Sequence, residues 1–410
     1  MAVTKTFAYT ARDGNGKKVT GRIDAASEGA VLSKLRVMGI APVTVSEADA
    51  GTGLNREINL PSIFTPRVGG KDLAIMSRQM STMIVSGLSL IKTLTILADQ
   101  TENKKLAATL VEVRGDVESG GALSDAFAKH PIIFPRLMIY LVKAGEAGGF
   151  LDRALDSVAK NLESDVKLRG TIKSALTYPI AVLIMAILGV FAMLIFIVPV
   201  FEGLFASFGG ELPAPTQILV TLSKNMIWIV PTVVVLVVAF TIWWNRNKHT
   251  EQVRKFVDPL KLKAPVFGGL ASKIAIARFS RNFAIMIGSG VPILQSLSIV
   301  GETSGNWVVE NALRKVQESV RTGKSIAAPL ADEPVFPAMV VQMIAVGEDS
   351  GSLQTMLDKV ADFYEEEVQA TAESLTALIE PLMIGVIGVV IGGMIVALYL
   401  PVFSIFEQIQ

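Results

Sequence analysis

The chain has no cysteine and only two histidines among its 410 residues. Without cysteine there is neither a disulfide framework nor a thiolate metal site. His130 and His249 lack a nearby Asp or Glu at metal-ligand spacing, so we assign them no role. The 38 basic and 37 acidic residues nearly cancel, so no basic field marks a nucleic-acid partner. We therefore expect no cofactor, no metal ion and no nucleic acid.

Signals of catalysis and of secretion are also missing. No base and nucleophile stand in matched positions, so we expect no enzymatic activity. Residues 322–325 resemble the end of a P-loop, but Glu318 stands where the phosphate cradle needs a glycine. We interpret this segment as a turn between helices. The first five residues lack an apolar h-region, so no cleaved signal peptide is expected.

Apolar residues are present in excess: they make up 51% of the chain and gather in three blocks without a charge, 180–200, 226–244 and 382–406. Each block can cross a hydrocarbon core of about 30 Å at about 1.5 Å per residue. Pro179 and Pro381 precede two blocks, and we expect each to stand at a helix entrance, where its missing N–H costs nothing. The sequence predicts transmembrane helices at 177–201, 226–244 and 379–406.

The same unit occurs twice in the chain. Arg78 corresponds to Arg281 with an offset of 203 residues, and after a one-residue deletion Pro135 corresponds to Pro337 with an offset of 202. Further pairs share these offsets: Gly87 and Gly290, Gly120 and Gly323, Gly145 and Gly347, Gly149 and Gly351, Leu155 and Leu357, and Pro179 and Pro381. The duplication predicts a pseudo-symmetric platform of two six-helix bundles.

Composition and periodicity divide the chain into segments. Residues 1–48 alternate as strands around the turn signal at 13–16, with one helix, which predicts a small ββαβ module. The other segments are a linker at 49–70, helical repeats at 71–176 and 273–378, a loop at 202–225, a basic linker at 245–272 and a tail at 407–410. The predicted fold class is an all-α integral membrane protein with two duplicated cytoplasmic bundles, three transmembrane helices and a small N-terminal α+β module.

Basic residues gather on one side of the predicted spans. Four lie between 160 and 173, before the first span, and six lie between 246 and 263, after the second. The segment 202–224 holds a single lysine. The positive-inside rule therefore predicts that residues 1–176 and 246–378 are cytoplasmic, with the C-terminus outside.

The sharpest motif is Gly-Glu-x-x-Gly-x-Leu-x-x-x-Leu-Asp, which begins at Gly145 and again at Gly347. It is interpreted either as a helix–turn–helix elbow, whose acids cap or face water, or as a contact of Glu146 and Glu348 with a partner or a divalent cation. We favour the elbow, because one carboxylate per copy is a poor metal site. The candidate partner-interface residues are Glu146, Asp156, Glu348, Asp358, Arg78 and Arg281.

Two further features concern packing. Arg78 and Arg281 stand at equivalent places on the first helix of each repeat, and we favour an intrachain ion pair, with acids such as Glu146 and Glu348, over an interface role. The third apolar block contains four glycines that favour close helix packing: Gly385, Gly388, Gly392 and Gly393. The partner helix is the first span, a second protomer or a substrate helix. No span carries an internal charge, which argues against a proton or ion pathway.

These features together resemble the type II secretion system protein F family, whose members include inner-membrane platform proteins of type II secretion and type IV pili. The resemblance covers nearly the whole chain. It includes Phe7, Tyr9, Asp13-Gly14, Gly21 and Leu35 in the N-terminal module, and Ser86-Gly87, Ser289-Gly290, Phe134-Pro135, Phe336-Pro337, Tyr178-Pro179, Glu380-Pro381 and both elbows beyond it.

The resemblance implies a multi-pass protein of the bacterial inner membrane with no catalysis of its own. It implies that the chain couples a hexameric assembly ATPase to polymerisation of pilin or pseudopilin subunits. Other inner-membrane components and a second copy, as a homodimer, are its further implied partners. The type IV pilus role is preferred, and the type II secretion platform is the alternative. A membrane transporter is a remote alternative, because there the repeats themselves would be membrane helices.

Overall fold

The computed structural model describes residues 5–12, 18–25, 28–37, 41–47, 68–208, 212–248 and 250–408. The chain divides into two compact units, Met1–Phe64 and Thr65–Gln410. The turn expected at 13–16 and most of the linker expected at 49–70 lie outside the described residues.

The first unit contains a three-stranded antiparallel sheet and one helix. Strand β1 (Lys5–Arg12) lies between β2 (Lys18–Ala25) and β3 (Ala41–Glu47). Helix α1 (Glu28–Val37) contributes Val31 and Leu35 to a small core with Ala25. This part of the chain therefore folds as ββαβ around a handful of apolar side chains.

The second unit begins with six helices joined by short turns. They are α2 (Gly70–Val85), α3 (Leu90–Gln100), α4 (Lys104–Glu118), α5 (Leu123–Ala128), α6 (Arg136–Gly148) and α7 (Leu151–Ala192). Gly87, Gly120 and Gly149 follow three of these helices with positive φ, a conformation that glycine adopts without steric cost. We call residues 70–176 of this group repeat 1.

Six later helices follow the same order. They are α11 (Gly268–Gly288), α12 (Ile293–Thr303), α13 (Trp307–Arg321), α14 (Ala327–Ala331), α15 (Ala338–Asp349) and α16 (Leu353–Gln408). Gly290, Gly323 and Gly351 have positive φ at the corresponding turns. We call residues 268–378 repeat 2. Buried apolar side chains of both repeats form one continuous core.

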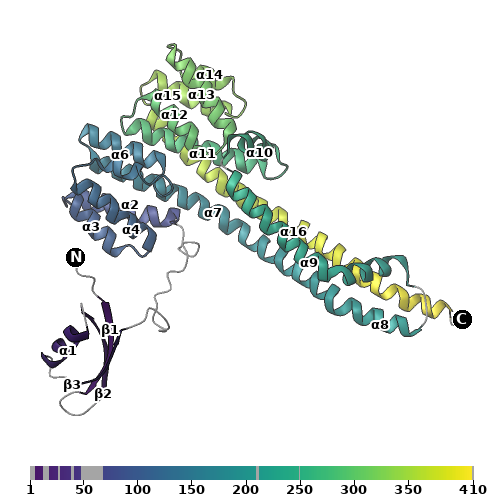
Figure 1. Ribbon diagram of the computed structural model, residues 1–410. Helices are drawn as coiled ribbons and strands as arrows, with labels where there is room; N and C mark the ends of the chain where they lie inside the picture. The colour runs from purple at the N-terminus through teal and green to yellow at the C-terminus, as the bar shows by residue number, and fades with distance from the viewer. Residues whose placement is uncertain are drawn as a thin grey trace. The chain divides into compact units, whose positions relative to one another are not determined.

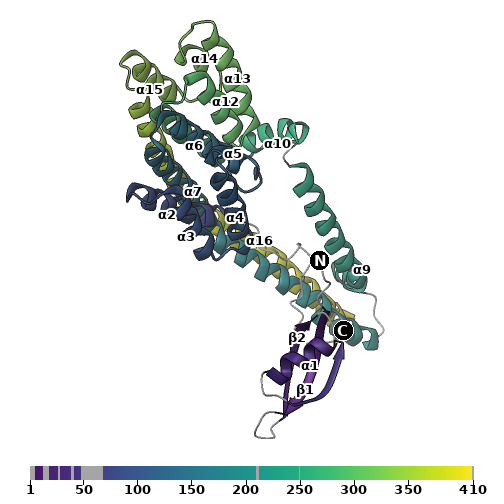
Figure 2. The ribbon, with the colours of Figure 1, turned by 60° about the vertical axis from the view of Figure 1, so that its left-hand side comes forward.

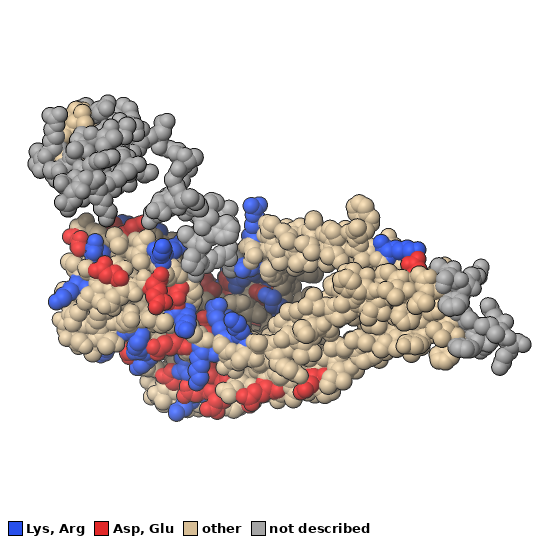
Figure 3. Space-filling model, turned by 90° about the horizontal axis from the view of Figure 1, so that it is seen from below, with Lys and Arg blue, Asp and Glu red and all other residues tan. Residues whose placement is uncertain are grey.

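Three helical stretches are long and apolar enough to cross a membrane: Leu151–Phe205, Ala214–Asn247 and Leu353–Phe403. The first joins α7, the π-helical turn η2 (Met193–Ile197) and α8 (Val198–Phe208), and the second is α9 (Ala214–Asn247). Helices α7 and α16 run side by side away from the repeats in both ribbon views (Figures 1 and 2). On the face seen in Figure 3, charged side chains gather over the repeats, and the long helices are almost uncharged.

The prolines of these stretches lie inside helices, so the expectation that Pro179 and Pro381 stand at helix entrances is wrong. A proline inside a helix cannot donate to the carbonyl four residues before it. For Pro179 that carbonyl belongs to Ala175, and it accepts a hydrogen bond from the Thr376 hydroxyl at 3.0 Å. A hydroxyl on another helix thus replaces the missing donor and allows α7 to continue.

Two other prolines are accommodated in the same way. Pro401 frees the carbonyl of Ala397, which accepts a hydrogen bond from the Thr216 hydroxyl. Pro199 follows η2, in which each N–H donates to the carbonyl five residues before it. Because proline has no N–H, the Leu194 carbonyl lacks this donor. The Ser223 hydroxyl donates to that carbonyl at 2.5 Å. Pro179, Pro199 and Pro401 therefore mark sites where one helix is hydrogen-bonded to another.

Segments expected to be loop or linker also contain helix. Helix α8 extends into the stretch expected as a loop at 202–225, and α10 (Glu251–Lys263) occupies much of the stretch expected as a basic linker. Asp258 of α10 is 3% exposed, and its carboxylate accepts the Trp307 N–H at 2.9 Å. That contact caps α13 and fixes α10 on repeat 2.

Candidate functional site at the junction of the repeats

The candidate interface arginines lie in matching ion-pair networks. Arg78 of α2 donates to Asp156 at 2.7 Å and to Glu163 at 2.7 and 2.6 Å, both on α7. Burial raises the pKa of the Asp156 carboxyl, but hydrogen bonds from Lys160 and Arg78 outweigh it, so that pKa lies below its usual value. The hydrogen bond from Arg78 likewise lowers the pKa of Glu163. Both acids are therefore firmly ionised at neutral pH.

Arg281 repeats this arrangement in a more enclosed setting. It donates to Asp358 at 3.1 Å, to Asp362 at 2.6 Å and to Glu365 at 2.9 Å. Its side chain is 19% exposed, against 37% for Arg78. Burial lowers the pKa of the Arg281 guanidinium, but the hydrogen bonds that it donates to Glu365 and Asp362 outweigh burial and raise that pKa. Burial and the neighbouring Asp362 charge raise the pKa of Asp358, although Arg281 opposes them.

The elbow glutamates bind backbone amides. Glu146 accepts the N–H groups of Leu123 and Ser124 at 2.6 and 3.1 Å, at the start of α5. Glu348 accepts the N–H groups of Ile326 and Ala327 at the start of α14, at 2.8 to 3.2 Å. Each carboxylate thus caps a short helix from the neighbouring segment of its own repeat. Arg78 and Arg281 therefore pair with acids other than Glu146 and Glu348, contrary to the expected partners.

The glycines of the motif have separate tasks. Gly149 and Gly351 have φ near 70° and end α6 and α15. A Cβ added at Gly145 would lie 2.4 Å from the Ala154 Cβ, and one at Gly347 would lie 2.9 Å from the Leu353 Cα. Gly145 and Gly347 therefore allow successive helices to pack closely. They lie inside α6 and α15, and the helix breaks fall only at the later glycines.

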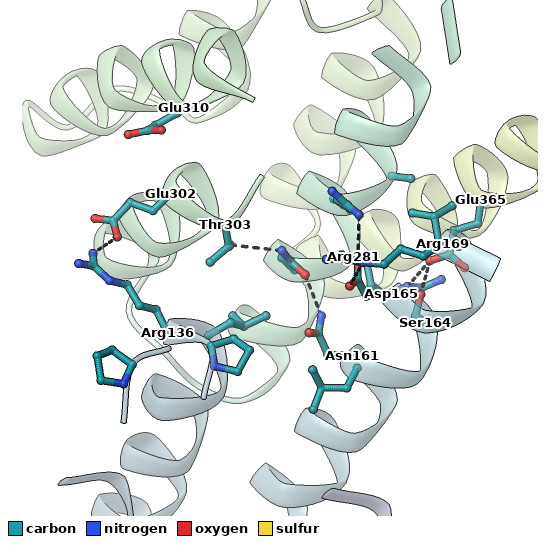
Figure 4. A pocket seen from close by; sticks show the side chains of 18 of the residues that line it. Arg136, Asn161, Ser164, Asp165, Arg169, Arg281, Glu302, Thr303, Glu310 and Glu365 are labelled. Atoms are coloured by element: carbon teal, nitrogen blue, oxygen red, sulfur yellow. Dashed lines mark hydrogen bonds and ion pairs between the residues drawn. The ribbon is translucent and has the colours of Figure 1, made fainter. Parts of the chain in front are cut away.

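A polar cavity of about 840 Å³ lies where the two repeats meet. Figure 4 shows Arg136 reaching across it towards Glu302 of α12, and the two form an ion pair. Deeper in the junction Asn161 of α7 donates to Asn282 of α11 at 2.7 Å. Ser164 of α7 donates to Glu365 of α16 at 2.8 Å. Polar contacts from several helices thus fix repeat 2 on α7.

A half-buried arginine completes the junction. Arg278 of α11 donates to Asp165 of α7 at 3.0 Å, and Arg169 donates to the same carboxylate at 2.6 Å. Burial lowers the pKa of the Arg278 guanidinium, and Asp165 opposes that effect. Two ion pairs, Arg136–Glu302 and Arg278–Asp165, thus connect the repeats. Among the described residues no group of three or more His, Cys, Asp or Glu side chains could hold a metal ion.

The glycines of α16 have open space on their Cβ side. A Cβ built at any of them would meet no atom within 4 Å outside the local helix backbone; they are Gly385, Gly388, Gly392 and Gly393. The first span therefore does not approach them closely. Of the packing partners considered from the sequence, a second protomer and a substrate helix remain.

The fold and the junction define the class: an α-helical membrane protein in which two helical bodies are fixed to each other by paired charges. The family described as "Type II secretion system (T2SS), protein F" matches residues 76–199 and 279–401. Its N-terminal domain, "Type II secretion system protein F, N-terminal domain", matches residues 1–46. The matched segments cover most of both repeats and the apolar helices that continue from them.

Curated relatives extend over almost the full chain. "Type IV pilus assembly protein PilC" of Myxococcus xanthus is 42% identical over 99% of this chain and 96% of its own length. The protein of the same name from Thermus thermophilus is 42% identical over 98% of this chain and 99% of its own length. "Type II secretion system protein F" of Vibrio cholerae is 29% identical over 97% of this chain and 98% of its own length. The chain belongs to the type II secretion system protein F family.

Sequence reasoning singled out the elbow glutamates and four members of the ion-pair networks, Arg78, Asp156, Arg281 and Asp358. It missed the other network acids, Glu163, Asp362 and Glu365, and it missed the junction. Asn161, Ser164 and Asp165 have no special signature in a helical repeat, and each bonds to a residue more than 100 positions away. Only their spacing on one face of a long helix could have drawn attention to them.

Proposed function

We propose that this chain is the inner-membrane platform protein of a type IV pilus assembly machine. The observation that carries the proposal is full-length similarity at 42% identity to proteins named for type IV pilus assembly, against 29% to one named for type II secretion. In this role the chain couples a hexameric cytoplasmic ATPase to the addition of pilin subunits. The platform of a type II secretion system is the second candidate, supported by the family that both kinds share.

The proposal gives each part of the chain a place. The helices α2–α7 and α11–α16 form two duplicated six-helix bundles in the cytoplasm, where the ATPase binds. The module in residues 1–48 is cytoplasmic and contacts the ATPase or another inner-membrane component. The C-terminus lies outside, and the chain acts as a homodimer. The basic residues that flank the apolar helices on the side of the repeats support this orientation.

The charged candidates enter the proposal mainly as residues that shape each bundle. Glu146 and Glu348 hold short helices, and Arg281 is enclosed by three acids. Arg78, Asp156 and Asp358, which are 37%, 33% and 39% exposed, are the candidates best placed to contact a partner directly. A partner that depends on Asp156 should lose affinity when this residue is replaced by asparagine.

Deletion of the gene in the host tests the role. Electron microscopy would count surface fibres, and an assay of the culture medium would measure secreted proteins. Loss of fibres with normal secretion is expected. Loss of secretion with normal fibres would make the chain a type II secretion platform, and no change in either would refute both assignments.

The glycines of α16 give a sharper test of subunit loading. Gly388→Leu with Gly392→Leu places bulky side chains where this chain has open space, so insertion and folding should be unchanged. If a pilin helix or a second protomer packs there, fibre assembly should stop. Gly189→Leu is the matched control, because that glycine of α7 also has open space around its Cβ. Normal fibres in the double variant would remove the glycine surface from the proposal.

A further inference from the structure

Repeat 2 holds α7 in a groove between α11 and α16. At the end near the membrane helices, Leu168 and Ile172 of α7 pack with Ile274 of α11 and Val368 of α16. Asn161 and Asp165 of α7 bond to α11, whereas Ser164 and Ala175 bond to α16. Repeat 2 therefore contains a built receptor for one face of a helix from repeat 1.

The contact between the repeats runs in one direction only. Helix α11 bonds to α7 at two places, but its counterpart α2 has no hydrogen bond or ion pair to α16 among the described residues. A two-fold arrangement would use both contacts, because each surface would then meet the same surface of its partner. The contact is instead heterologous: repeat 2 supplies the groove and repeat 1 supplies the helix face. The groove of repeat 1 and the helix face of repeat 2 are left unused.

Repeat 1 has its own version of the receptor groove. A groove of about 380 Å³ lies between α2 and α7, and its lining includes Ala74, Ile75, Arg78, Gln79 and Glu163. At the offsets of 203 and 202 these correspond to Ala277, Arg278, Arg281, Asn282 and Glu365, which line the junction in repeat 2. No described residue from outside α2 and α7 lines this groove. Ile75 is 49% exposed there.

Repeat 2 likewise has an unused version of the inserted helix face. At the offset of 202, five counterparts of the α7 residues that enter the junction are exposed on α16: Phe363, Glu366, Ala370, Ser374 and Ala377. The sixth, Glu367, corresponds to Asp165; it is half-buried and pairs with Lys273 of its own repeat at 2.7 Å. Phe363, which corresponds to Asn161, is 44% exposed. Repeat 1 thus has an open groove, and repeat 2 has an exposed helix face that corresponds to the face already seated inside the chain.

The geometry allows a second copy to join at the same depth in a membrane. Both α7–α16 hydrogen bonds connect residues 201 apart, within one residue of the repeat offset, so the two helices run parallel and nearly in register. Superposing repeat 1 on repeat 2 therefore requires little shift along the helix axis. A second copy related to the first by the same superposition would have its apolar helices at the same level as those of the first copy.

We propose that a second copy of this chain docks head to tail, with the exposed face of its α16 seated in the α2–α7 groove of repeat 1. The interface is the intermolecular version of the junction already present inside each chain. It rests on the self-association included in the proposed function, but not on the ATPase or pilin roles. Because the contact is heterologous, its repetition closes a ring where the rotation between successive repeats divides a full turn, and otherwise gives an open array.

Charge supports this occupant. In the groove lining Arg78 is already paired with Asp156 and Glu163, so the remaining charge is that of Lys71 and Lys167. The α16 face carries Glu366 and has no basic residue among its five members. In the arrangement seen inside the chain Ser164 contacts Glu365, so Glu366 would lie near Glu163, with Lys167 of the same groove as the opposite charge. Acidic helix and basic groove are complementary.

A freed carbonyl supports it independently. Pro381 cannot donate to the carbonyl of Ala377, just as Pro179 cannot donate to that of Ala175. Thr376 satisfies Ala175, but no side chain among the described residues donates to Ala377. The residue at the position of Thr376 in repeat 1 is Ser174, which is exposed. In the proposed interface the Ser174 hydroxyl of one copy meets the Ala377 carbonyl of the other.

The absence of cysteine makes thiol cross-linking a direct test. Asn161 and Asn282 touch inside one chain, and their counterparts at the proposed interface are Phe363 and Gln79. Two differently tagged full-length chains, one with Gln79→Cys and one with Phe363→Cys, would be co-expressed and treated in membranes with a short thiol-to-thiol cross-linker. We expect a covalent dimer that contains both tags. Each variant expressed alone should give none.

Two controls make the result decisive. Asn161→Cys with Asn282→Cys in one chain should give an intrachain link, which shows that the reagent spans this geometry. Gln79→Cys with Val111→Cys should give no dimer, because Val111 is as exposed as Phe363, at 46%, but lies outside the proposed face. An intrachain link without the Gln79–Phe363 dimer would overturn the proposal, as would equal dimer with Val111, or capture of Gln79 by a different protein. These outcomes leave the assembly role intact, because fibres are scored separately.

Discussion

Replacement of Thr376 by valine tests how α7 passes through Pro179. Valine keeps the β-branched shape but removes the hydroxyl that donates to the Ala175 carbonyl. That carbonyl has no intrahelical donor, because the residue four positions later is proline. An acceptor left without a partner in a part-buried site costs about 1–3 kcal/mol. We expect the free energy of unfolding of the detergent-solubilised chain to fall by about that amount.

A double-mutant cycle separates this effect from simple loss of packing. Pro179→Ala restores a backbone donor for Ala175, so Thr376→Val should cost much less in that background, with a coupling of about 1 kcal/mol or more. Thr177→Val is the matched control. The Thr177 hydroxyl donates at 2.7 Å to the backbone carbonyl of Lys173, but that carbonyl also accepts the helical N–H of Thr177, so it keeps a donor when the hydroxyl is removed. Equal cost of Thr376→Val with and without Pro179 would refute the reasoning.

Three further predictions concern the charged networks. Glu348→Gln removes the charged cap of α14 and should lower the free energy of unfolding by about 1–2 kcal/mol, measured by denaturant titration. Arg281→Met should lower the free energy of unfolding by about 1–3 kcal/mol in the same assay, and Arg78→Met by about 1 kcal/mol or less. The difference is expected because Arg281 is 19% exposed and Arg78 is 37% exposed, so solvent screens the ion pairs of Arg78 more strongly. The folded-state pKa values of Asp156 and Glu163 lie below their usual values, so their stabilisation is present above about pH 4 and is lost as pH falls through the lowered values. Asp156→Asn with Glu163→Gln should therefore flatten the loss of stability between about pH 5 and pH 3, whereas an unchanged slope would assign that loss to other groups.

Local signals in the sequence were enough to locate the turns of both repeats. Gly87 and Gly290, and Gly149 and Gly351, recur at the repeat offsets, and each has the positive φ that favours glycine at a helix end. The apolar blocks likewise marked the three stretches able to cross a membrane. These features depend on a few consecutive residues, which is why one sequence suffices.

The failures depend on contacts between distant segments. Pro179 was assigned to a helix start because a local rule cannot anticipate that Thr376 replaces its missing donor. Arg78 was correctly given an intrachain ion pair, but Asp156 and Glu163 rather than Glu146 supply it, since the register of α2 on α7 decides which acid is within reach. The junction of the repeats was not predicted at all for the same reason.

The length of α16 has a mechanical consequence. Its 56 residues form one uninterrupted helix of about 84 Å, which begins inside repeat 2 and ends beyond the apolar stretch. No loop interrupts it, although Pro381 and Pro401 lie inside it. A movement of repeat 2 would therefore be carried along the helix to its far end, where the Thr216 hydroxyl at Ala397 connects it to α9. Repeat 2 is joined to the apolar stretch by continuous helix and not by a flexible linker.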